Sequence, residues 1–121
     1  MEVDLEEELA EQDASSARSV YLRELYFEMT EDSEKRNFDF LDDITIRVSS
    51  RKPGSDLPEV DLAWRDPVPE DQDGFALDID EDLDLKPYAE EGLRLNTRVS
   101  GSSPSREARF KVFASFRVRV L

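Results

Sequence analysis

The sequence predicts an all-β protein, an antiparallel sandwich of about six to eight strands with one short helical turn. Apolar and polar residues alternate in six segments, and clusters of Pro, Gly, Ser and Asp separate these segments. Strands with one apolar and one charged face are typical of antiparallel sheets that cover a shared core. The chain has 121 residues, enough for one such core, so we expect a single domain over residues 18–121.

The first predicted strand spans residues 18–30 and changes parity once. Its apolar residues follow one parity up to Leu22 and the opposite parity from Leu25 onward. Period-two alternation requires a slip to do this, so we expect a β-bulge near Arg23–Glu24. A helix is the alternative, because Leu22, Leu25 and Met29 are three or four residues apart. The Tyr, Phe, Val and Thr content favours the strand.

The middle of the chain contains three further alternating segments. Residues 42–50 give the clearest half-buried strand, and residues 51–58 form a Pro-Gly turn. Trp64 is in phase with two apolar residues of the next strand, which predicts that its ring lies in the core. The following strand covers residues 75–79, where the apolar residues Phe75, Leu77 and Ile79 alternate with Asp78 and Asp80.

The last third of the chain begins with a helical turn at residues 86–92, which has Pro near its start and Gly at its end. Tyr88 lies in this turn and is expected at the surface. A strand follows at residues 93–99. Residues 109–121 form the longest alternating segment and would span about 40 Å, so we expect a bend or bulge near Ala114–Ser115.

Residues 1–17 carry seven acidic residues and no basic one. Asp4 and Glu7 have the spacing of a capping box, and Leu5 and Leu9 are four residues apart, which indicates a short helix. Val3 and Leu5 suit a short strand equally well. We therefore expect an acidic arm or a marginal helix ahead of the domain.

Composition excludes several classes of function. The net charge is −14, which disfavours binding to nucleic acid. The chain has no Cys and no His, so disulfides, thiolate metal sites and histidine general bases are absent. No apolar run approaches the roughly 20 residues that span a bilayer, so no direct membrane insertion is expected. The acidic N-terminus differs from a secretory signal, so the protein is either cytoplasmic or exported with its signal already removed.

We also expect the protein not to be an enzyme. Ser102, Ser103 and Ser105 have no histidine partner, and the four glycines form no phosphate-binding motif. Carboxylate pairs occur by chance among 30 acidic residues, and no pattern marks a pocket that would raise the pKa of one of them.

The acidic stretch Glu70–Asp84 is the sharpest chemical feature, because carboxylates at this density bind Ca²⁺ in other proteins. Aligned with a twelve-residue calcium loop, Gly74 takes the turn position, but Pro69 falls on the first ligand and Asp80 on the last, where Glu is expected. We interpret the stretch as solvated strand and turn faces. The alternative is a calcium-dependent binding module with the candidate ligands Asp71, Asp73, Asp78 and Asp80.

A second acidic cluster precedes the strand at residues 42–50 and consists of Asp39, Asp42 and Asp43. It would lie beside the first cluster if the two occupy the same end of the sandwich. We interpret these residues as turn and cap residues whose side chains accept hydrogen bonds from backbone N–H groups.

Charge is distributed unevenly along the chain. Residues 56–93 hold fourteen acidic residues and two basic ones, whereas residues 94–121 hold seven basic residues and one acidic one. Within the last strand, a basic stripe alternates with the apolar face: Arg109, Lys111, Arg117 and Arg119. One interpretation is internal, with cross-strand ion pairs and protection of a strand edge. The other is a docking strip for an acidic protein partner, or for head-to-tail self-association.

Aromatic residues offer a further candidate surface. Tyr21, Tyr26, Trp64 and Tyr88 could line a carbohydrate-binding platform on a sandwich. The phase of Trp64 argues against this, because it predicts a buried ring.

Three segments of the sequence resemble uncharacterised envelope lipoprotein-like domains of predatory and myxobacterial-type bacteria: Phe38–Ile44 (FDFLDDI), Leu57–Val60 (LPEV) and Asp82–Tyr88 (DLDLKPY). The resemblance covers most of residues 18–121 and implies an immunoglobulin-like sandwich of the cell envelope. The sequence departs from the pattern in having no signal segment and no lipid-accepting Cys. The resembled domains have no assigned site, so no functional residue is carried over.

We therefore expect a non-enzymatic interaction or structural module, of the cell envelope if a signal was removed. The main alternative is the calcium-dependent module. A third alternative is an acidic decoy that mimics a phosphate backbone toward a basic partner.

Overall fold

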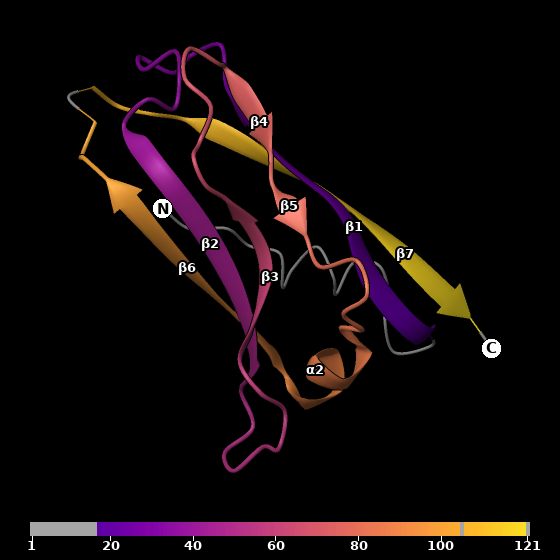
Figure 1. Cartoon of the computed structure of the whole chain (residues 1–121). Helices are drawn as coiled ribbons and strands as arrows, with labels where there is room; N and C mark the ends of the chain where they lie inside the picture. Colours follow the sequence, from indigo (N-terminus) through magenta and orange to yellow (C-terminus); the bar gives the residue numbers. More distant parts are fainter. Residues whose placement is uncertain (1–16, 105, 121) are drawn as a thin grey trace.

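The computed structural model describes residues 17–104 and 106–120, which form a two-layer β-sandwich with a short helix at one end (Figure 1). Seven strands and the helix follow one another in this order: β1 (Ala17–Met29), β2 (Leu41–Ser50), β3 (Val60–Arg65), β4 (Gly74–Ala76), β5 (Asp78–Ile79), α2 (Lys86–Glu91), β6 (Leu93–Gly101) and β7 (Phe110–Val120). One sheet has the order β4–β1–β7 and the other β5–β3–β2–β6. All pairings are antiparallel, so the predicted fold class is confirmed. The expected arm at residues 1–17 lies almost wholly outside the described residues.

The core lies between the two sheets and is built mainly from β1 and β2. Their inward side chains are fully buried: Val20, Leu22, Leu25, Phe27, Ile44, Ile46 and Val48. At one end, four phenylalanine rings come together: Phe27, Phe75 and Phe110 from the β4–β1–β7 sheet, and Phe38 from the loop before β2. The ring centroid of Phe38 lies 5.0 Å from that of Phe75 and 5.7 Å from that of Phe110. This cluster packs the loop before β2 against the β4–β1–β7 sheet.

The bulge predicted in the first strand is confirmed. Leu22 pairs with Phe116 and Glu24 pairs with Ser115, so Arg23 is an extra residue in β1. The bulge expected near Ala114–Ser115 in the last strand is not there, because β7 is continuous at this point and β1 carries the extra residue. The alternative of a helix at residues 18–30 is wrong.

Trp64 is 36 % exposed, so the prediction that it lies in the core is wrong. The cause is a second bulge. Ile46 pairs with Ala63 and Arg47 pairs with Asp61, which leaves Leu62 as the extra residue in β3. Leu62 and Ala63 are consequently both buried, and the indole after them lies on the outer face.

The predicted strand at residues 75–79 is split at Leu77 between the two sheets. β4 pairs with β1, whereas β5 pairs with β3. At the crossing, the backbone N–H of Leu77 donates to the carbonyl of Leu25 at 2.9 Å, and that of Asp80 donates to the carbonyl of Leu62 at 3.0 Å. We call this crossing, Gly74–Ile79, the closed edge of the sandwich.

The opposite side of the sandwich ends in β6 and β7, which we call the open edge. Among the described residues, β6 pairs only with β2, and β7 pairs only with β1. No described segment crosses between the sheets along these two strands, which are joined at one end by the loop that follows Gly101 (Figure 1).

Tyr88 in α2 is 3 % exposed, so the prediction of a surface position is wrong. The helix folds back over the end of the core, because the N–H of Leu85 donates to the carbonyl of Val20 at 2.7 Å. The hydroxyl of Tyr88 then donates to the carbonyl of Pro58 at 2.7 Å. Burial raises the pKa of the Tyr88 phenol above its usual value.

Candidate functional site

The outer face of β7 combines positive charge with an exposed aromatic ring. Residues of one parity, from Phe110 to Val118, are half-buried toward the core, while those of the other parity are exposed. Phe113 is 50 % exposed in the middle of the strand. We define the β7 strip by the four exposed side chains with binding potential: Lys111, Phe113, Arg117 and Arg119.

The neighbouring strand β1 adds two tyrosines to this face. The register places Tyr26 opposite Phe113 and Tyr21 opposite Arg117. The guanidinium carbon of Arg117 lies 4.7 Å from the centroid of the Tyr21 ring, which is a cation–π contact. Directly opposite residues in a sheet have neighbouring side chains, so aromatic and cationic groups lie together on the outer face. The same register places Glu28 opposite Lys111 and Glu24 opposite Ser115, so the face also carries two carboxylates.

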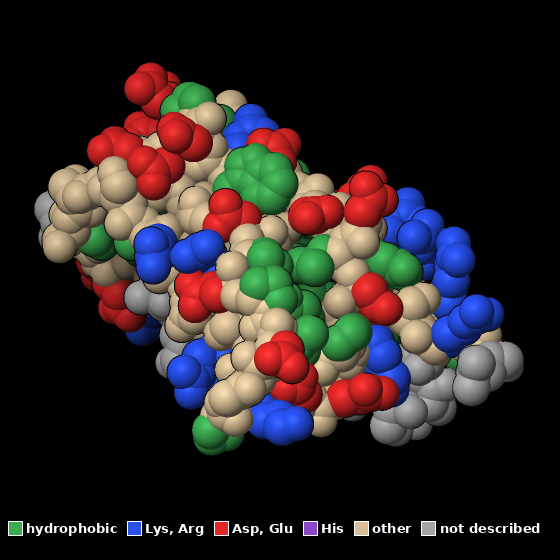
Figure 2. Space-filling model, turned by 60° about the horizontal axis from the view of Figure 1, so that its bottom comes forward, with side chains coloured by type: hydrophobic (Ala, Val, Ile, Leu, Met, Phe, Trp, Pro, Cys, Tyr) green, Lys and Arg blue, Asp and Glu red, His purple; other side chains and the backbone are tan. Residues whose placement is uncertain are grey.

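The three cations of the β7 strip form no ion pair within the described part of the chain. The residues opposite Arg117 and Arg119 are Tyr21 and Ser19, neither of which carries a charge. The cross-strand neutralisation considered from the sequence therefore does not occur at these two arginines. Figure 2 shows Lys and Arg side chains gathered at its right, the side where Figure 1 places the C-terminal end of β7.

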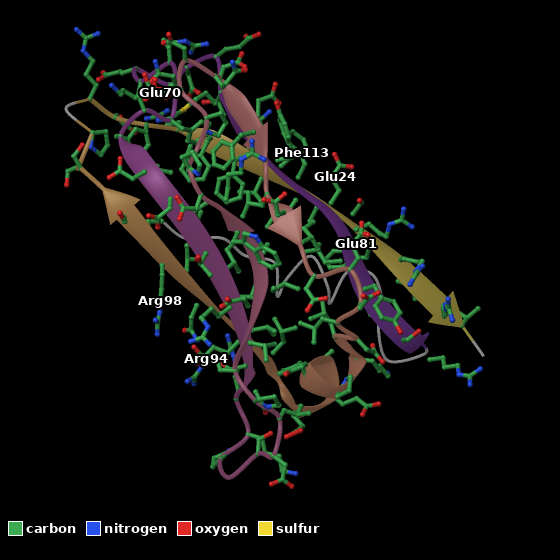
Figure 3. The ribbon with its side chains drawn as sticks, viewed as in Figure 1. Glu24, Glu70, Glu81, Arg94, Arg98 and Phe113 are labelled. Atoms are coloured by element: carbon green, nitrogen blue, oxygen red, sulfur yellow. The ribbon has the colours of Figure 1, made fainter. Side chains whose placement is uncertain are left out.

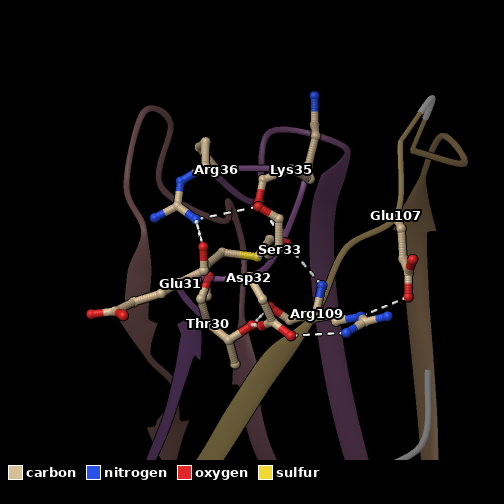
Figure 4. Close-up of polar contacts among 9 residues, drawn as sticks. Thr30, Glu31, Asp32, Ser33, Lys35, Arg36, Glu107 and Arg109 are labelled. Atoms are coloured by element: carbon tan, nitrogen blue, oxygen red, sulfur yellow. Dashed lines mark hydrogen bonds and ion pairs between the residues drawn. The ribbon is translucent and has the colours of Figure 1, made fainter.

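Arg109, which belongs to the same sequence stripe, has a different environment (Figure 4). Its Nη1 lies 2.8 Å from Asp32 Oδ2 and its Nε lies 2.7 Å from Glu107 Oε1. Its backbone N–H donates to Ser33 Oγ at 2.9 Å. Arg109 thus fastens the loop after β1 to the start of β7, and we exclude it from the strip.

The same contacts shift the pKa values of Asp32 and Arg109. The hydroxyl of Thr30 and then the guanidinium of Arg109 hold the pKa of the Asp32 carboxyl below its usual value. The carboxylates of Glu107 and Asp32 raise the pKa of Arg109 in turn. Both charges are exposed, so solvent screens their attraction.

The four candidate calcium ligands are spread over turns and a strand. Asp78 lies in β5 opposite Trp64, and Asp80 Oδ1 accepts a hydrogen bond from the N–H of Asp82 at 3.1 Å. The N–H of Asp71 donates to Asp39 Oδ1 at 2.8 Å, so the two acidic clusters do meet at this end of the sandwich. Within residues 17–104 and 106–120, no three acidic side chains form a group that could hold a metal ion, Asp71, Asp73, Asp78 and Asp80 included.

The four aromatic residues proposed as a carbohydrate platform lie in three different places. Tyr21 and Tyr26 are on the outer face of the sheet that contains β7, Trp64 is on the outer face of the other sheet, and Tyr88 is buried. Sequence reasoning missed Phe113 as a surface residue. The available signal was its parity, since an aromatic in phase with Lys111 and Arg117 must share their exposed face.

The other sheet also carries cations, but in a different setting. Arg47 is paired with Glu59 at 3.1 Å and with Asp61 at 2.9 Å. Arg94 and Arg98 of β6 are exposed and point away from the molecule on the side opposite Phe113 (Figure 3). Arg98 faces Thr45, so it has no aromatic neighbour of the kind that Arg117 has in Tyr21.

The inner face of the open edge is less well covered than the rest of the core. Val118 and Phe116 of β7 are half-buried, whereas Val20 and Leu22 opposite them in β1 are fully buried. At the end near the β6–β7 loop, an open groove of about 820 Å³ has a mixed lining of charged, polar and apolar residues, of which the apolar ones include Phe40, Leu41, Val99, Ala108 and Phe110. The open edge therefore presents apolar as well as cationic groups.

Comparisons with protein families, with functionally characterised proteins and with solved structures give no significant match. No helix in the described residues has the length and apolar character needed to cross a membrane.

Proposed function

We propose that this domain is a non-catalytic protein-binding module that takes an acidic segment of a partner protein on the β7 strip. The observation that carries the proposal is the half-exposed ring of Phe113 on the same face as Arg117 and Arg119, which form no ion pair among the described residues and have no carboxylate opposite them in β1. Aromatic and arginine side chains are the groups that most often dominate the binding energy of protein interfaces. An edge strand that presents both is well suited to hold a partner.

Electrostatics favours an acidic partner and confines it to this surface. The chain as a whole carries a net charge of −14, so most of its surface repels an acidic segment. The strip attracts such a segment locally, and the attraction weakens as salt is added. The same net charge opposes the approach of a long polyanion, which is why we propose a protein rather than a nucleic acid.

A short fluorescein-labelled peptide rich in Glu and Leu serves as the probe, with binding followed by fluorescence anisotropy at low salt. We expect the double substitution Arg117→Glu, Arg119→Glu to weaken binding about tenfold or more, and Phe113→Ala to weaken it several-fold. The matched control is Arg94→Glu, Arg98→Glu, which makes the same charge change on the other sheet and should leave the affinity nearly unchanged.

Equal loss of affinity in both double variants would contradict the proposal, because it would show attraction to net charge alone. Peptide binding that survives both strip substitutions would also contradict it. Melting curves of each variant establish that the fold is retained. Turnover of ester, glycoside or peptide substrates by the unmodified protein would contradict the non-catalytic part of the proposal.

A place in the cell envelope is supported by the resemblance of three sequence segments to envelope lipoprotein-like domains. Fractionation of cells that produce the protein from its own gene tests the location. Recovery in the envelope fraction is the expected result, and recovery only in the cytoplasm would contradict it.

A further inference from the structure

The edge of β7 that faces away from β1 has no strand beside it in the described part of the chain. Within residues 17–104 and 106–120, β7 (Phe110–Val120) pairs on one side only, with β1. The backbone hydrogen bonds of the described loops and turns do not involve these residues either. Among the described residues, the strand therefore presents a row of N–H and C=O groups of the kind that an added strand uses.

The inner side chains of β7 form an apolar row that is incompletely covered. All of them are half-buried: Phe110, Val112, Ala114, Phe116 and Val118. The corresponding row of β6, the other strand of the open edge, is less suitable, because Thr97 interrupts it and Leu93 is already buried. Apolar residues on one face of a strand added to β7 would cover its row and remove apolar surface from water.

The outer side chains of β7 favour acidic neighbours. Arg117 and Arg119 form no ion pair among the described residues, and no acidic residue lies opposite them in β1. Side chains of directly opposite residues on adjacent strands are in contact distance of each other. A carboxylate on the outer face of an added strand would therefore lie directly beside these two guanidinium groups.

A second copy of β7 is a poor candidate for the added strand. Antiparallel pairing of two β7 strands over their full length, centred on Ser115, would place Lys111 opposite Arg119 of the other copy. Like charges directly opposite each other in a sheet are destabilising. A strand that fits must instead carry apolar residues on its inner face and acidic residues on its outer face.

We propose that the acidic partner adds to the edge of β7 as a further strand, with alternate apolar residues facing inward and acidic residues facing outward. This inference rests on the proposed function and states how the partner is bound. Backbone hydrogen bonds to β7 provide affinity, and the alternate side chains provide specificity. The partner is then recognised by its alternation of apolar and acidic residues, and total negative charge alone is insufficient.

Two peptides of equal composition test the alternation. In one, Glu and Leu alternate strictly; in the other, all Glu residues precede all Leu residues, so the net charge is the same. Both are labelled with fluorescein, and fluorescence anisotropy measures their affinity for the full chain. We expect the blocked peptide to bind about tenfold or more weakly, because it cannot cover the inner row and face the arginines at once.

Backbone methylation of the alternating peptide tests the strand pairing itself. Successive residues of a strand direct their N–H groups to opposite edges, so the Glu N–H groups share one edge and the Leu N–H groups share the other. One peptide is methylated at the Glu nitrogens and a second at the Leu nitrogens, which removes those donors. We expect one of them to lose about tenfold or more in affinity and the other to stay within about twofold of the parent.

The outcomes separate this inference from the proposed function. If the parent, blocked and both methylated peptides bind equally well, the partner contacts the strip through side chains and charge alone, and the strand addition is wrong. An equal loss in both methylated peptides also contradicts it, because an added strand uses only one of its edges. If no peptide binds, the proposed function itself fails.

Hydrogen exchange of the full chain locates the added strand. Alternate β7 amides should exchange rapidly in the free protein and at least about tenfold more slowly with the alternating peptide, while the β6 amides are unchanged. The variant Arg117→Glu, Arg119→Glu should show no slowing at the same peptide concentration. Slow exchange of all β7 amides in the free protein would overturn the proposal, because the edge would already be paired. Slowing in β6 instead of β7 would also overturn it.

Discussion

The two edges of this sandwich are made from strands with similar alternating sequences, but they end differently. At the closed edge the chain passes from one sheet to the other at Leu77, and backbone hydrogen bonds join it to Leu25 and Leu62. At the open edge β6 and β7 each have one described neighbour, and no described segment joins the sheets along them. The side chains reflect this difference: those of β1 that face the core are fully buried, and those of β7 are half-buried.

The two edges of the sandwich contribute differently to the stability of the fold and to the recognition of a partner. Residues at the centre and at the closed edge bury most of the apolar surface that stabilises the fold. The open edge contributes less to that burial and retains accessible cations, an exposed ring and an unpaired edge. A small domain can place its binding surface there because partner contacts at an edge strand leave the core unchanged.

The largest expected effect comes from two valines that face each other across β1 and β7. Val20 pairs with Val118, yet Val20 is fully buried and Val118 is half-buried. Val20→Ala should lower the free energy of unfolding by about 1.5–3 kcal/mol, because it removes two methyl groups and leaves a cavity. Val118→Ala should lower it by about half as much, since its site is partly solvated and can relax. Urea denaturation measures both values.

Equal losses in the two variants would contradict the contrast between the edges. A larger loss in Val118→Ala would show that the open edge is covered more completely than the described residues indicate. Unchanged m-values in both variants are needed for the comparison, because they show that the surface exposed on unfolding is the same.

A smaller effect is expected at the end of the sandwich, where α2 covers the core. Tyr88→Phe should lower the free energy of unfolding by about 1 kcal/mol at neutral pH, because the hydrogen bond to the carbonyl of Pro58 is lost. Burial raises the folded-state pKa of Tyr88 above the unfolded value of 10.0, so its protonated form is favoured by folding. This contribution is present below about pH 10 and is lost as the pH rises further.

The measurement is thermal unfolding of the wild type and Tyr88→Phe between neutral pH and pH 11. The wild type should lose stability more steeply above pH 10 than the variant does. Parallel curves over the alkaline range would mean that the Tyr88 phenol is as well solvated in the folded state as in the unfolded one.

Alternation in the sequence was enough to predict the sandwich, the main strands and the bulge at Arg23. That bulge left a signal, because the apolar parity changes between Leu22 and Leu25. The bulge at Leu62 left none: Ala63 is small enough for either face, so Trp64 seemed to continue the phase of Leu62. Bulges of this kind depend on the partner strand rather than on local residues.

The remaining differences between the sequence-based predictions and the structure arise from which strands lie next to each other in the fold. Phe75, Leu77 and Ile79 alternate without interruption, and only the pairing partners show that the chain changes sheets at Leu77. The basic stripe was visible in the sequence. Whether it is neutralised depends on which strand lies next to it, and that strand presents Ser19 and Tyr21 to the two arginines. The separation of the aspartates at residues 71–80 depends on topology in the same way.

The most direct test of a binding role for the open edge is an NMR titration of the full chain with the Glu–Leu peptide. We expect amide shift changes concentrated on the outer strip of β7 and β1, at Tyr21, Phe113 and Arg117. These changes should disappear in Arg117→Glu, Arg119→Glu. Shift changes centred on β6 or on the acidic stretch Glu70–Asp84, with β7 unaffected, would contradict it.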